Sequence, residues 1–361
     1  FSEVGYHGER TRLISATALL GLGGAFIQTI LTYQHEATQI FGKVLSIDGF
    51  SLFFKLFFIF LAGLAILTSM GAREIRADKR AEYCALIVAS ALAMCLAASA
   101  SDLLLAFLAL QFLNVLGYFL SAFGKTSVLS TEAAVKHMAF GVVSGVLFLY
   151  GVAILFSATH AINIYDMHKV LLTAPLSRET GLVVFTLIFL SLSFQFAAFP
   201  MHLWAPDVLE GAPTPVSAFL AVGSRAVGFA VAVRLLLVVF AQPALAQGQW
   251  QVMGGLDWPK VVALVSGITM TIGSLLAFRQ TSAKRLVAYL VVAQTGFLLL
   301  GLLVLDEVGV AALLYNLVVE LFAVLGVFYV LSFLYDELQS DHLDSLRGML
   351  ARAVPECIAL I

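Results

Sequence analysis

The sequence predicts an all-α membrane protein with about ten transmembrane helices, and three observations support this prediction. Hydrophobic residues make up 61% of the 361 residues, charged residues only 12%, and the mean hydropathy is +1.00. This apolar share is above that of soluble globular proteins. The apolar residues also fall into windows of about 20 residues, the length that a helix needs to cross the hydrocarbon core. The net charge of −2 gives no basic surface, so nucleic acid is not an expected partner.

Ten windows are long and apolar enough to span a membrane. In chain order they lie near residues 13–33, 50–71, 82–99, 102–123, 132–157, 181–204, 214–240, 260–278, 285–305 and 309–335. An eleventh is expected to begin at about Ala353. The longest connections, 158–180 and 241–259, are predicted to be short ordered loops. Residues 1–361 are therefore expected to form a single polytopic membrane domain.

Local signals justify the ends and packing faces of several windows. Asp102 follows a very short connection and is expected to cap the next helix, because its carboxylate can accept hydrogen bonds from the first backbone N–H groups. The Phe-rich window 50–71 is expected to face lipid or neighbouring helices. Close helix packing is predicted where small residues recur, at Gly117, Gly141, Gly145 and Gly151.

If successive windows cross the membrane in opposite directions, the basic residues of the connections divide unequally between its two faces. One face collects most lysines and arginines of the connections, and the other has only Lys43, Lys169, Arg178 and Lys260. Because positive residues gather on the cytoplasmic or matrix side, Phe1 is expected to start there. The chain opens without a methionine and stops inside an apolar run, so both ends are expected to be truncated.

Residues 195–215 interrupt the apolar pattern with prolines, acids and a histidine. Proline ends or kinks a helix, and irregular backbone within a bilayer survives only where protein or a water-filled cavity satisfies its polar groups. A helix is therefore predicted to break near Pro200, inside the protein. Broken membrane helices are typical of transport elements. The motif consists of Pro200, Trp204, Pro206, Asp207, Gly211 and Pro213.

Charged side chains within the windows are the first candidates for a proton path, because each costs roughly 2.5–3.5 kcal/mol to insert. Lys136 can release a proton when it is desolvated, whereas Arg225 stays protonated and is expected on a hydrated path or against an acid. Glu320 lies near mid-helix and must be neutral or paired across helices. Its possible partners are Lys284, Arg285 and Lys136. For each of these charges the alternative is a purely structural role.

Other polar residues add weaker candidates. Gln111, Gln195 and Gln294 can bridge helices or order water but cannot bind and release a proton at ordinary pH. His202, next to the break, can titrate near neutrality or serve as a hydrogen-bonded loop residue. Arg234 is nearer a membrane interface and is expected to be structural.

The sequence predicts no catalytic, metal or nucleotide site. Its seven histidines form no convincing pair for haem, and no phosphate-binding glycine loop is visible. Cys84, Cys95 and Cys357 lack the close spacing of metal sites or disulfide frameworks and are expected to be free thiols. No cofactor is expected to bind this chain.

Two long motifs resemble one family. Ala205-Pro-Asp-Val-Leu-Glu-Gly-Ala-Pro-Thr-Pro-Val, preceded by Phe199-Pro-Met-His-Leu-Trp, resembles the Trp-x-Pro-Asp-Val-Tyr-x-Gly-Ala-Pro signature of the antiporter-like membrane subunits of respiratory complex I. The segment from Lys284 to Gly301 is similar to a second motif of the N-type members, which mitochondria call NADH dehydrogenase subunit 2. Thr131-Glu-Ala-Ala-Val-Lys-His and Asp48-Gly-Phe also match, so the resemblance covers essentially the whole chain.

The resemblance implies a truncated antiporter-like fold built from inverted repeats. Residues 82–240 would form the first repeat, with its broken helix near Pro200, and residues 260–361 an incomplete second repeat. The family has roughly fourteen helices, so the chain would lack the first helix and about the last three.

Departures from the family pattern fall where the family carries its proton-handling charges. The resemblance aligns a family glutamate with Gln111, one lysine with Gln195, the next lysine with Arg225, and a histidine with Gln294. Lys136 matches a family lysine. The resemblance thus implies that this chain's own proton path is degenerate, with proton storage left to Lys136, Glu320 or His202.

The implied function is that of a membrane-arm subunit of a proton-translocating NADH:quinone oxidoreductase, in the bacterial plasma membrane or the mitochondrial inner membrane. NADH, FMN, iron–sulfur clusters and quinone would be held by partner subunits, so the chain would belong to an enzyme without containing its redox site. Other membrane-arm subunits and lipids would be its partners. Two alternatives stay open: a subunit of a multi-subunit sodium/proton antiporter, and a non-pumping structural subunit.

Overall fold

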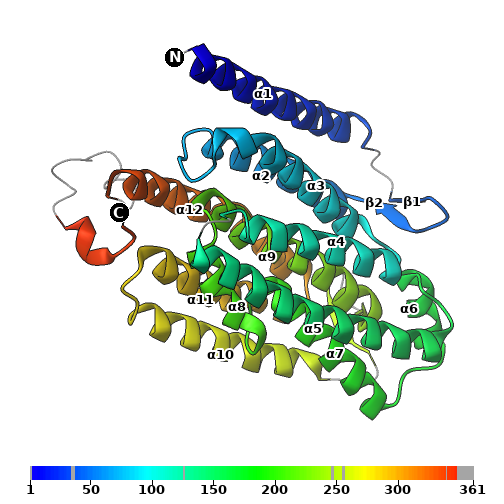
Figure 1. The fold of residues 1–361 in the computed structure, drawn as a ribbon. Helices are drawn as coiled ribbons and strands as arrows, with labels where there is room; N and C mark the ends of the chain where they lie inside the picture. Colours follow the sequence, from blue (N-terminus) through cyan, green and yellow to red (C-terminus); the bar gives the residue numbers. More distant parts are fainter. Residues whose placement is uncertain are drawn as a thin grey trace.

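The computed structural model describes residues 2–33, 37–124, 127–244, 248–253, 257–338 and 340–347. Among them, ten helices are long and apolar enough to cross a membrane, which confirms the predicted fold class and number of spans. They pack into one bundle (Figure 1). The predicted eleventh span, from Ala353 onward, lies outside the described residues.

The elements follow the predicted windows closely. The first half of the chain contains α1 (Ser2–Leu31), β1 (Thr38–Ile40), β2 (Leu45–Ile47), α2 (Gly49–Ser69), the 3₁₀ turn η1 (Ala77–Lys79), α3 (Arg80–Ser99), α4 (Leu103–Ser121), α5 (Val128–Thr159), α6 (Ile164–Thr173) and α7 (Arg178–Phe196). The second half contains η2 (Met201–Leu203), α8 (Trp204–Gly211), α9 (Thr214–Val239), β3 (Ala241–Pro243), β4 (Trp250–Val252), α10 (Trp258–Ala277), α11 (Ala283–Leu303), α12 (Glu307–Leu338) and η3 (Leu343–Leu346).

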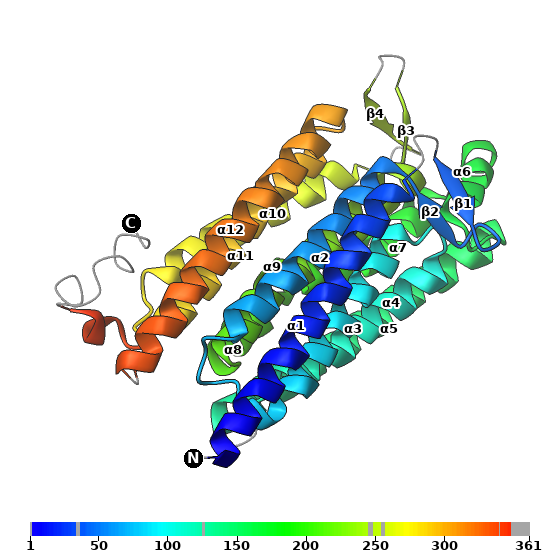
Figure 2. The ribbon, with the colours of Figure 1, turned by 90° about the horizontal axis from the view of Figure 1, so that it is seen from above.

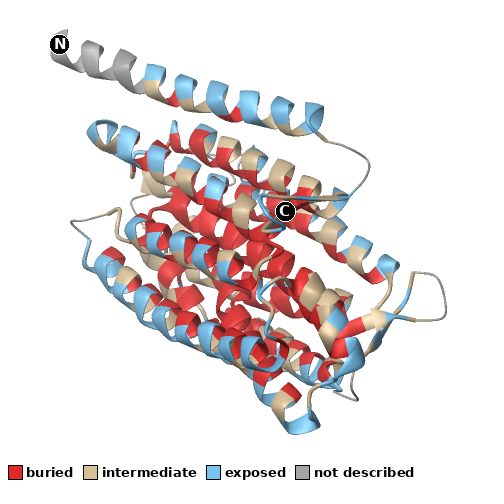
Figure 3. Cartoon of the chain, turned by 90° about the vertical axis from the view of Figure 1, so that its right-hand side faces the viewer, coloured by how far each residue is buried: buried red, intermediate tan, exposed pale blue. Residues whose placement is uncertain are grey.

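Helix α9 is the centre of the bundle. Buried residues make up 89% of its most apolar stretch, because α2, α3, α4, α6, α7, α8, α11 and α12 all contact it. The outer helices bury one face and expose the other (Figure 3). Helix α1 is the extreme case, with 11% of its apolar stretch buried, and it packs along one side against α2, η1 and α3. The polar residues of α9, from Thr214 to Arg234, are all buried as a result.

The predicted break near Pro200 is confirmed. Helix α7 ends at Phe196, and Ala197 follows in the left-handed region with φ of 59°. The chain then makes the η2 turn and continues as α8. The break is anchored to α10, because the backbone N–H of Phe199 donates to Thr269 Oγ1 at 3.1 Å. This contact satisfies a polar group that the interrupted helix leaves free.

The prediction for the longest connections was wrong in one respect. Residues 158–180 contain a helix, α6, which buries Ile164, Met167 and Leu171. It is amphipathic and short, so it falls below the length by which a spanning helix is recognised. The other connection forms the antiparallel hairpin β3–β4, and β1–β2 forms a second hairpin. Both hairpins and α6 lie at one end of the bundle, opposite the start of α1 (Figure 2).

Capping side chains explain where several helices begin. The expected cap at Asp102 is confirmed, since its carboxylate accepts from the backbone N–H groups of Leu104 and Leu105 at 2.9 and 3.0 Å. Asp48 caps α2 in the same way, with Ser51 completing a capping box. Such caps satisfy the donors at a helix start that lack an intrahelical partner.

Candidate functional site

An ion pair between Arg225 and Glu320 lies in the core of the bundle. Arg225 Nη1 is 2.9 Å from Glu320 Oε2, and the two side chains are 3% and 4% exposed. Each residue is roughly 16–20 Å from the start of its helix, α9 or α12, at 1.5 Å per residue, which places the pair near the middle of an approximately 30 Å hydrocarbon core. Arg225 was expected either on a hydrated path or next to an acid, and it lies next to the acid Glu320. The partners suggested for Glu320 were wrong, because the acid pairs with Arg225.

The guanidinium of Arg225 is also held by two carbonyl groups. Its Nε donates to Ala221 O at 2.5 Å, and Nη1 donates to Val291 O of α11 at 3.2 Å. Neither buried oxygen of Glu320 has a hydrogen-bond donor with good geometry among the described residues. Opposite charge at short range therefore joins α9 to α12, while the carbonyl contacts fix the orientation of the arginine.

Next to this pair, a chain of uncharged hydrogen bonds crosses three helices. Ser224 Oγ donates to Gln195 Oε1 at 3.0 Å. Gln195 Nε2 donates to Asn114 Oδ1 at 2.8 Å, and Asn114 Nδ2 donates to Gln111 Oε1 at 3.0 Å. The chain thus runs from α9 through the end of α7 to α4. Ser224 and Arg225 are consecutive residues of α9, so the amide chain and the ion pair begin at neighbouring positions of that helix. We call the two together the midplane row: Gln111, Asn114, Gln195, Ser224, Arg225 and Glu320.

The sequence interpretation missed two members of the midplane row, Ser224 and Asn114, and a local signal was present for Asn114. Asn114 lies three residues after Gln111, and side chains three apart on a helix share a face. That spacing is the signal that could have identified it. Gln111 itself packs against Gly145 of α5, where an added Cβ atom would collide with Gln111 Nε2. The close packing predicted at this glycine therefore makes room for a polar side chain.

A second cluster of charges forms where the broken helix resumes. Asp207 of α8 binds Lys136 of α5, with Oδ2 and Nζ 2.7 Å apart, and Arg285 of α11, with Oδ1 and Nη1 2.9 Å apart. Glu132 and Glu210 complete the cluster, since they bind Lys136 at 2.6 Å and Arg285 at 2.7 Å. The side chain of Lys136 is 40% exposed, so this network is far less enclosed than the midplane row.

Lys136 is therefore separate from the midplane row. No ion pair or side-chain hydrogen bond among the described residues joins the Lys136 cluster to Arg225 or Gln195. Beside that cluster, Lys284 Nζ binds Glu74 Oε1 at 3.1 Å, and Glu74 Oε2 accepts the backbone N–H of Thr214 at 2.7 Å. Glu74 therefore links the start of α9 to Lys284 of α11.

The remaining motif residues shape the break. Trp204 donates from Nε1 to Phe194 O at 3.0 Å and stacks on His137, with ring centroids 4.6 Å apart. Gly211 lets α8 approach α5, because a Cβ atom there would lie 2.6 Å from the carbonyl oxygen of Leu129. Pro206 is buried within α8, and Pro213 precedes the first turn of α9. Pro200 begins the η2 turn.

Two predicted candidates do not join either cluster. Gln294 is exposed on α11, on the side away from the buried residues Ala293 and Thr295. His202 is buried in the η2 turn, and its Nδ1 has no hydrogen-bond partner among the described residues. Their role in proton transfer remains a prediction.

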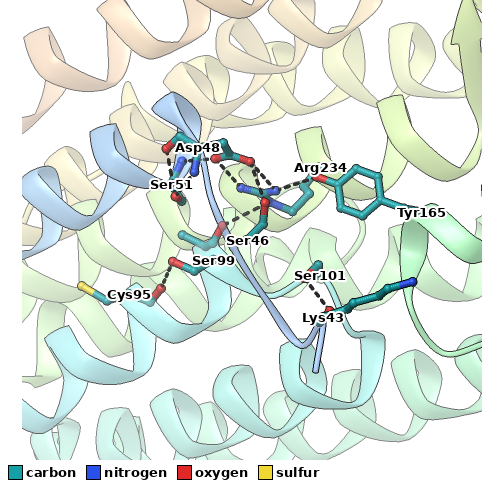
Figure 4. Close-up of polar contacts among 10 residues, drawn as sticks. Lys43, Ser46, Asp48, Ser51, Cys95, Ser99, Ser101, Tyr165 and Arg234 are labelled. Carbon is teal, nitrogen blue, oxygen red and sulfur yellow. Dashed lines mark hydrogen bonds and ion pairs between the residues drawn. The ribbon is translucent and has the colours of Figure 1, made fainter. Parts of the chain in front are cut away.

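At the hairpin end of the bundle, Arg234 of α9 is bound by Asp48 (Figure 4). Arg234 Nη1 and Nη2 bind the two carboxylate oxygens of Asp48 at 2.9 and 3.0 Å, and Nη1 also donates to Tyr165 OH at 3.2 Å. Burial would raise the pKa of Asp48, but the hydrogen bonds and charge of Arg234, together with hydrogen bonds from Ser51 and Ser46, outweigh burial and lower this pKa below its usual value. This geometry agrees with the structural role expected for Arg234.

Metal binding finds no support in the described part of the chain, where no three His, Cys, Asp or Glu side chains gather closely enough to hold an ion. Cys84 and Cys95 are free thiols, as expected, and Cys357 lies outside the described residues.

Comparison with known proteins decides the family. Residues 100–361 match the family model described as "NADH:quinone oxidoreductase/Mrp antiporter, TM". The chain belongs to this family. It is 33% identical over 344 residues to NADH-quinone oxidoreductase subunit N of Chlorobium chlorochromatii, covering 95% of this chain and 66% of the relative. It is 31% identical to subunit N of Anaeromyxobacter sp., covering 97% of this chain and 69% of the relative. The chain thus spans about two thirds of the length of these relatives.

Solved structures share the fold of this chain. A chain of respiratory complex I from Thermus thermophilus superposes with a TM-score of 0.77 at 28% identity, over 96% of this chain and 71% of that one. A chain of an archaeal membrane-bound sulfane sulfur reductase superposes with a TM-score of 0.82 at 21% identity, over 98% of this chain and 71% of that one, and shares the fold. As a family member with ten apolar helices, the chain is an integral membrane protein.

Proposed function

We propose that this chain is an N-type membrane-arm subunit of a proton-translocating NADH:quinone oxidoreductase. The names of its relatives and the likeness to a chain of respiratory complex I support this proposal. In such a complex, NADH, FMN, iron–sulfur clusters and quinone are held by partner subunits. The relatives come from bacteria, which favours the bacterial plasma membrane over the mitochondrial inner membrane.

Within that complex, we propose that the subunit is a fixed part of the membrane arm and does not store protons along its midplane row. The observation that carries this proposal is the unbroken amide chain Gln111–Asn114–Gln195 next to the Arg225–Glu320 pair. Amide groups cannot bind and release a proton at ordinary pH, and the guanidinium stays protonated. The permanent charge of Arg225 favours the ionised form of Glu320, so we propose that the row holds its helices together with fixed dipoles and a lasting ion pair.

Purification of the chain with its partners from native membranes tests the assignment to the complex. We expect subunits that contain flavin and iron–sulfur clusters to co-purify, and mass spectrometry to identify them. Co-purification of membrane subunits alone, together with sodium-dependent proton flux in reconstituted vesicles, would contradict the proposal in favour of a sodium/proton antiporter.

A further inference from the structure

A groove opens at the membrane surface between the beginning of α3 and the end of α4. Its volume is about 640 Å³, within the range of small-molecule sites. One wall is a stripe on α3 at helical spacing, Glu82, Ala85, Leu86 and Ala89. The opposite wall is formed by Phe119 and Phe123. Ala85 and Phe119 are exposed, so the groove is accessible from the side of the bundle.

The two ends of the groove differ in polarity. Its mouth is lined by Glu74, Arg76, Lys79 and Glu82, whereas the residues beyond Glu82 are alanine, leucine and phenylalanine. From Glu82 to Ala89 the helix rises about 10 Å at 1.5 Å per residue, so the apolar part reaches well into the hydrocarbon region. The charged mouth lies at the helix ends, at the level of lipid headgroups.

The charges at the mouth are balanced and accessible. Lys79 Nζ binds Glu82 Oε1 at 3.0 Å, and Arg76 binds Asp78 through two contacts of 3.0 and 3.1 Å. Their side chains are between 41% and 75% exposed. Exposed pairs of this kind contribute little stability, so a ligand that offers both a negative and a positive group can insert between them. Glu74 is satisfied by Lys284 and Thr214 and is not available.

We propose that this groove binds one phospholipid with a zwitterionic headgroup that carries a primary ammonium. The headgroup phosphate binds Arg76 and Lys79, and the ammonium donates to Glu82. One acyl chain lies between the α3 stripe and the two phenylalanines. A helix of a partner protein fits less well, because the apolar wall on α3 extends for only about two helical turns, from Glu82 to Ala89.

Lipid binding to the intact complex tests the proposal. The complex is placed in nanodiscs of phosphatidylcholine that contain phosphatidylethanolamine or phosphatidylglycerol, and a photoreactive residue at position 119 captures whatever occupies the groove. We expect capture of phosphatidylethanolamine. Ala85→Phe fills the groove and is expected to lower this capture about tenfold. This is the loss of affinity expected when roughly two methylene groups of an acyl chain lose their contacts. Ala153→Phe, at an exposed alanine of α5, is the matched control and keeps full capture.

A second pair of variants tests the headgroup contacts. Lys79→Gln with Glu82→Gln removes an exposed pair at the mouth without changing net charge, and Lys260→Gln with Asp257→Asn removes a comparable pair away from the groove. We expect loss of the preference for phosphatidylethanolamine only in the first. Equal capture of all three lipids by the parent protein, unchanged capture in Ala85→Phe, or capture of a polypeptide at position 119 would overturn the proposal. None of these outcomes bears on the function proposed above.

Discussion

At residue 225, the difference between arginine and lysine decides what the centre of the bundle can do. A desolvated lysine can lose its proton, but arginine keeps its charge and requires a permanent counter-charge. Glu320 supplies it at 2.9 Å. The cost of leaving either charge alone in this environment is far larger than the net stability contributed by the pair.

Removing one partner should therefore destabilise the protein more than removing both. We expect Glu320→Ala to lower the free energy of unfolding by about 3–5 kcal/mol, because it leaves Arg225 buried and uncompensated. The double variant Arg225→Met with Glu320→Leu should recover most of that loss. Thermal unfolding in detergent measures both, and a double variant no more stable than Glu320→Ala would contradict the interpretation.

Asp48 gives a prediction for pH. Its pKa is lower in the folded protein than in the unfolded chain, so its pair with Arg234 stabilises the fold above the unfolded pKa, and this contribution is lost as pH falls through the folded pKa. We expect the unfolding temperature to fall in this acid range, and the fall to be smaller in Asp48→Asn, which can still cap α2. Identical acid profiles for the two proteins would rule out this role.

At the scale of elements, the broken helix depends on close contact between α8 and α5. A methyl group at position 211 would meet the backbone of Leu129 and the side chain of Ala133, at 2.6 and 2.9 Å. Neither neighbour has a flexible end that can move away. The contact also holds Asp207 within reach of Lys136, so packing and charge pairing at the break depend on one glycine.

Gly211→Ala should therefore cost about 1–3 kcal/mol through overpacking. Gly267→Ala in α10 is the control, since no atom lies within 4 Å of its added methyl group and alanine favours helix by about 0.5–1 kcal/mol. Unfolding temperatures should move in opposite directions. A stable Gly211→Ala protein would show that α8 can move away from α5 freely.

The sequence predicted the positions of the helices better than the side-chain contacts between them. Hydropathy found every described spanning helix, and the prolines located the break, because both signals are local. The sequence interpretation did not find α6, which is amphipathic. It also missed the pairing of Glu320 with Arg225, because these two residues lie 95 positions apart on different helices. Asn114 could have been predicted, because its spacing from Gln111 is a local signal. The exposure of Gln294 could not, because it depends on the rotation of α11 about its own axis in the bundle.

At the scale of the whole molecule, the midplane row connects residues of four membrane helices, and the proposed function requires that its groups keep their protonation state. The predicted division into repeats at 82–240 and 260–361 remains a prediction, but Arg225–Glu320 lies across that boundary. If the division holds, one fixed ion pair joins the two halves at the depth where a transported proton would have to be held.

The most direct test is the proton-to-electron stoichiometry of the complex in sealed vesicles, compared between the parent protein and the double variant Gln111→Glu with Gln195→Lys. The variant restores an acid and a lysine to the row at the two ends of the Asn114 bridge. If the row is fixed in the parent protein, the stoichiometry should change in the variant. An unchanged stoichiometry, in a variant that assembles and oxidises NADH at the parent rate, would contradict the account.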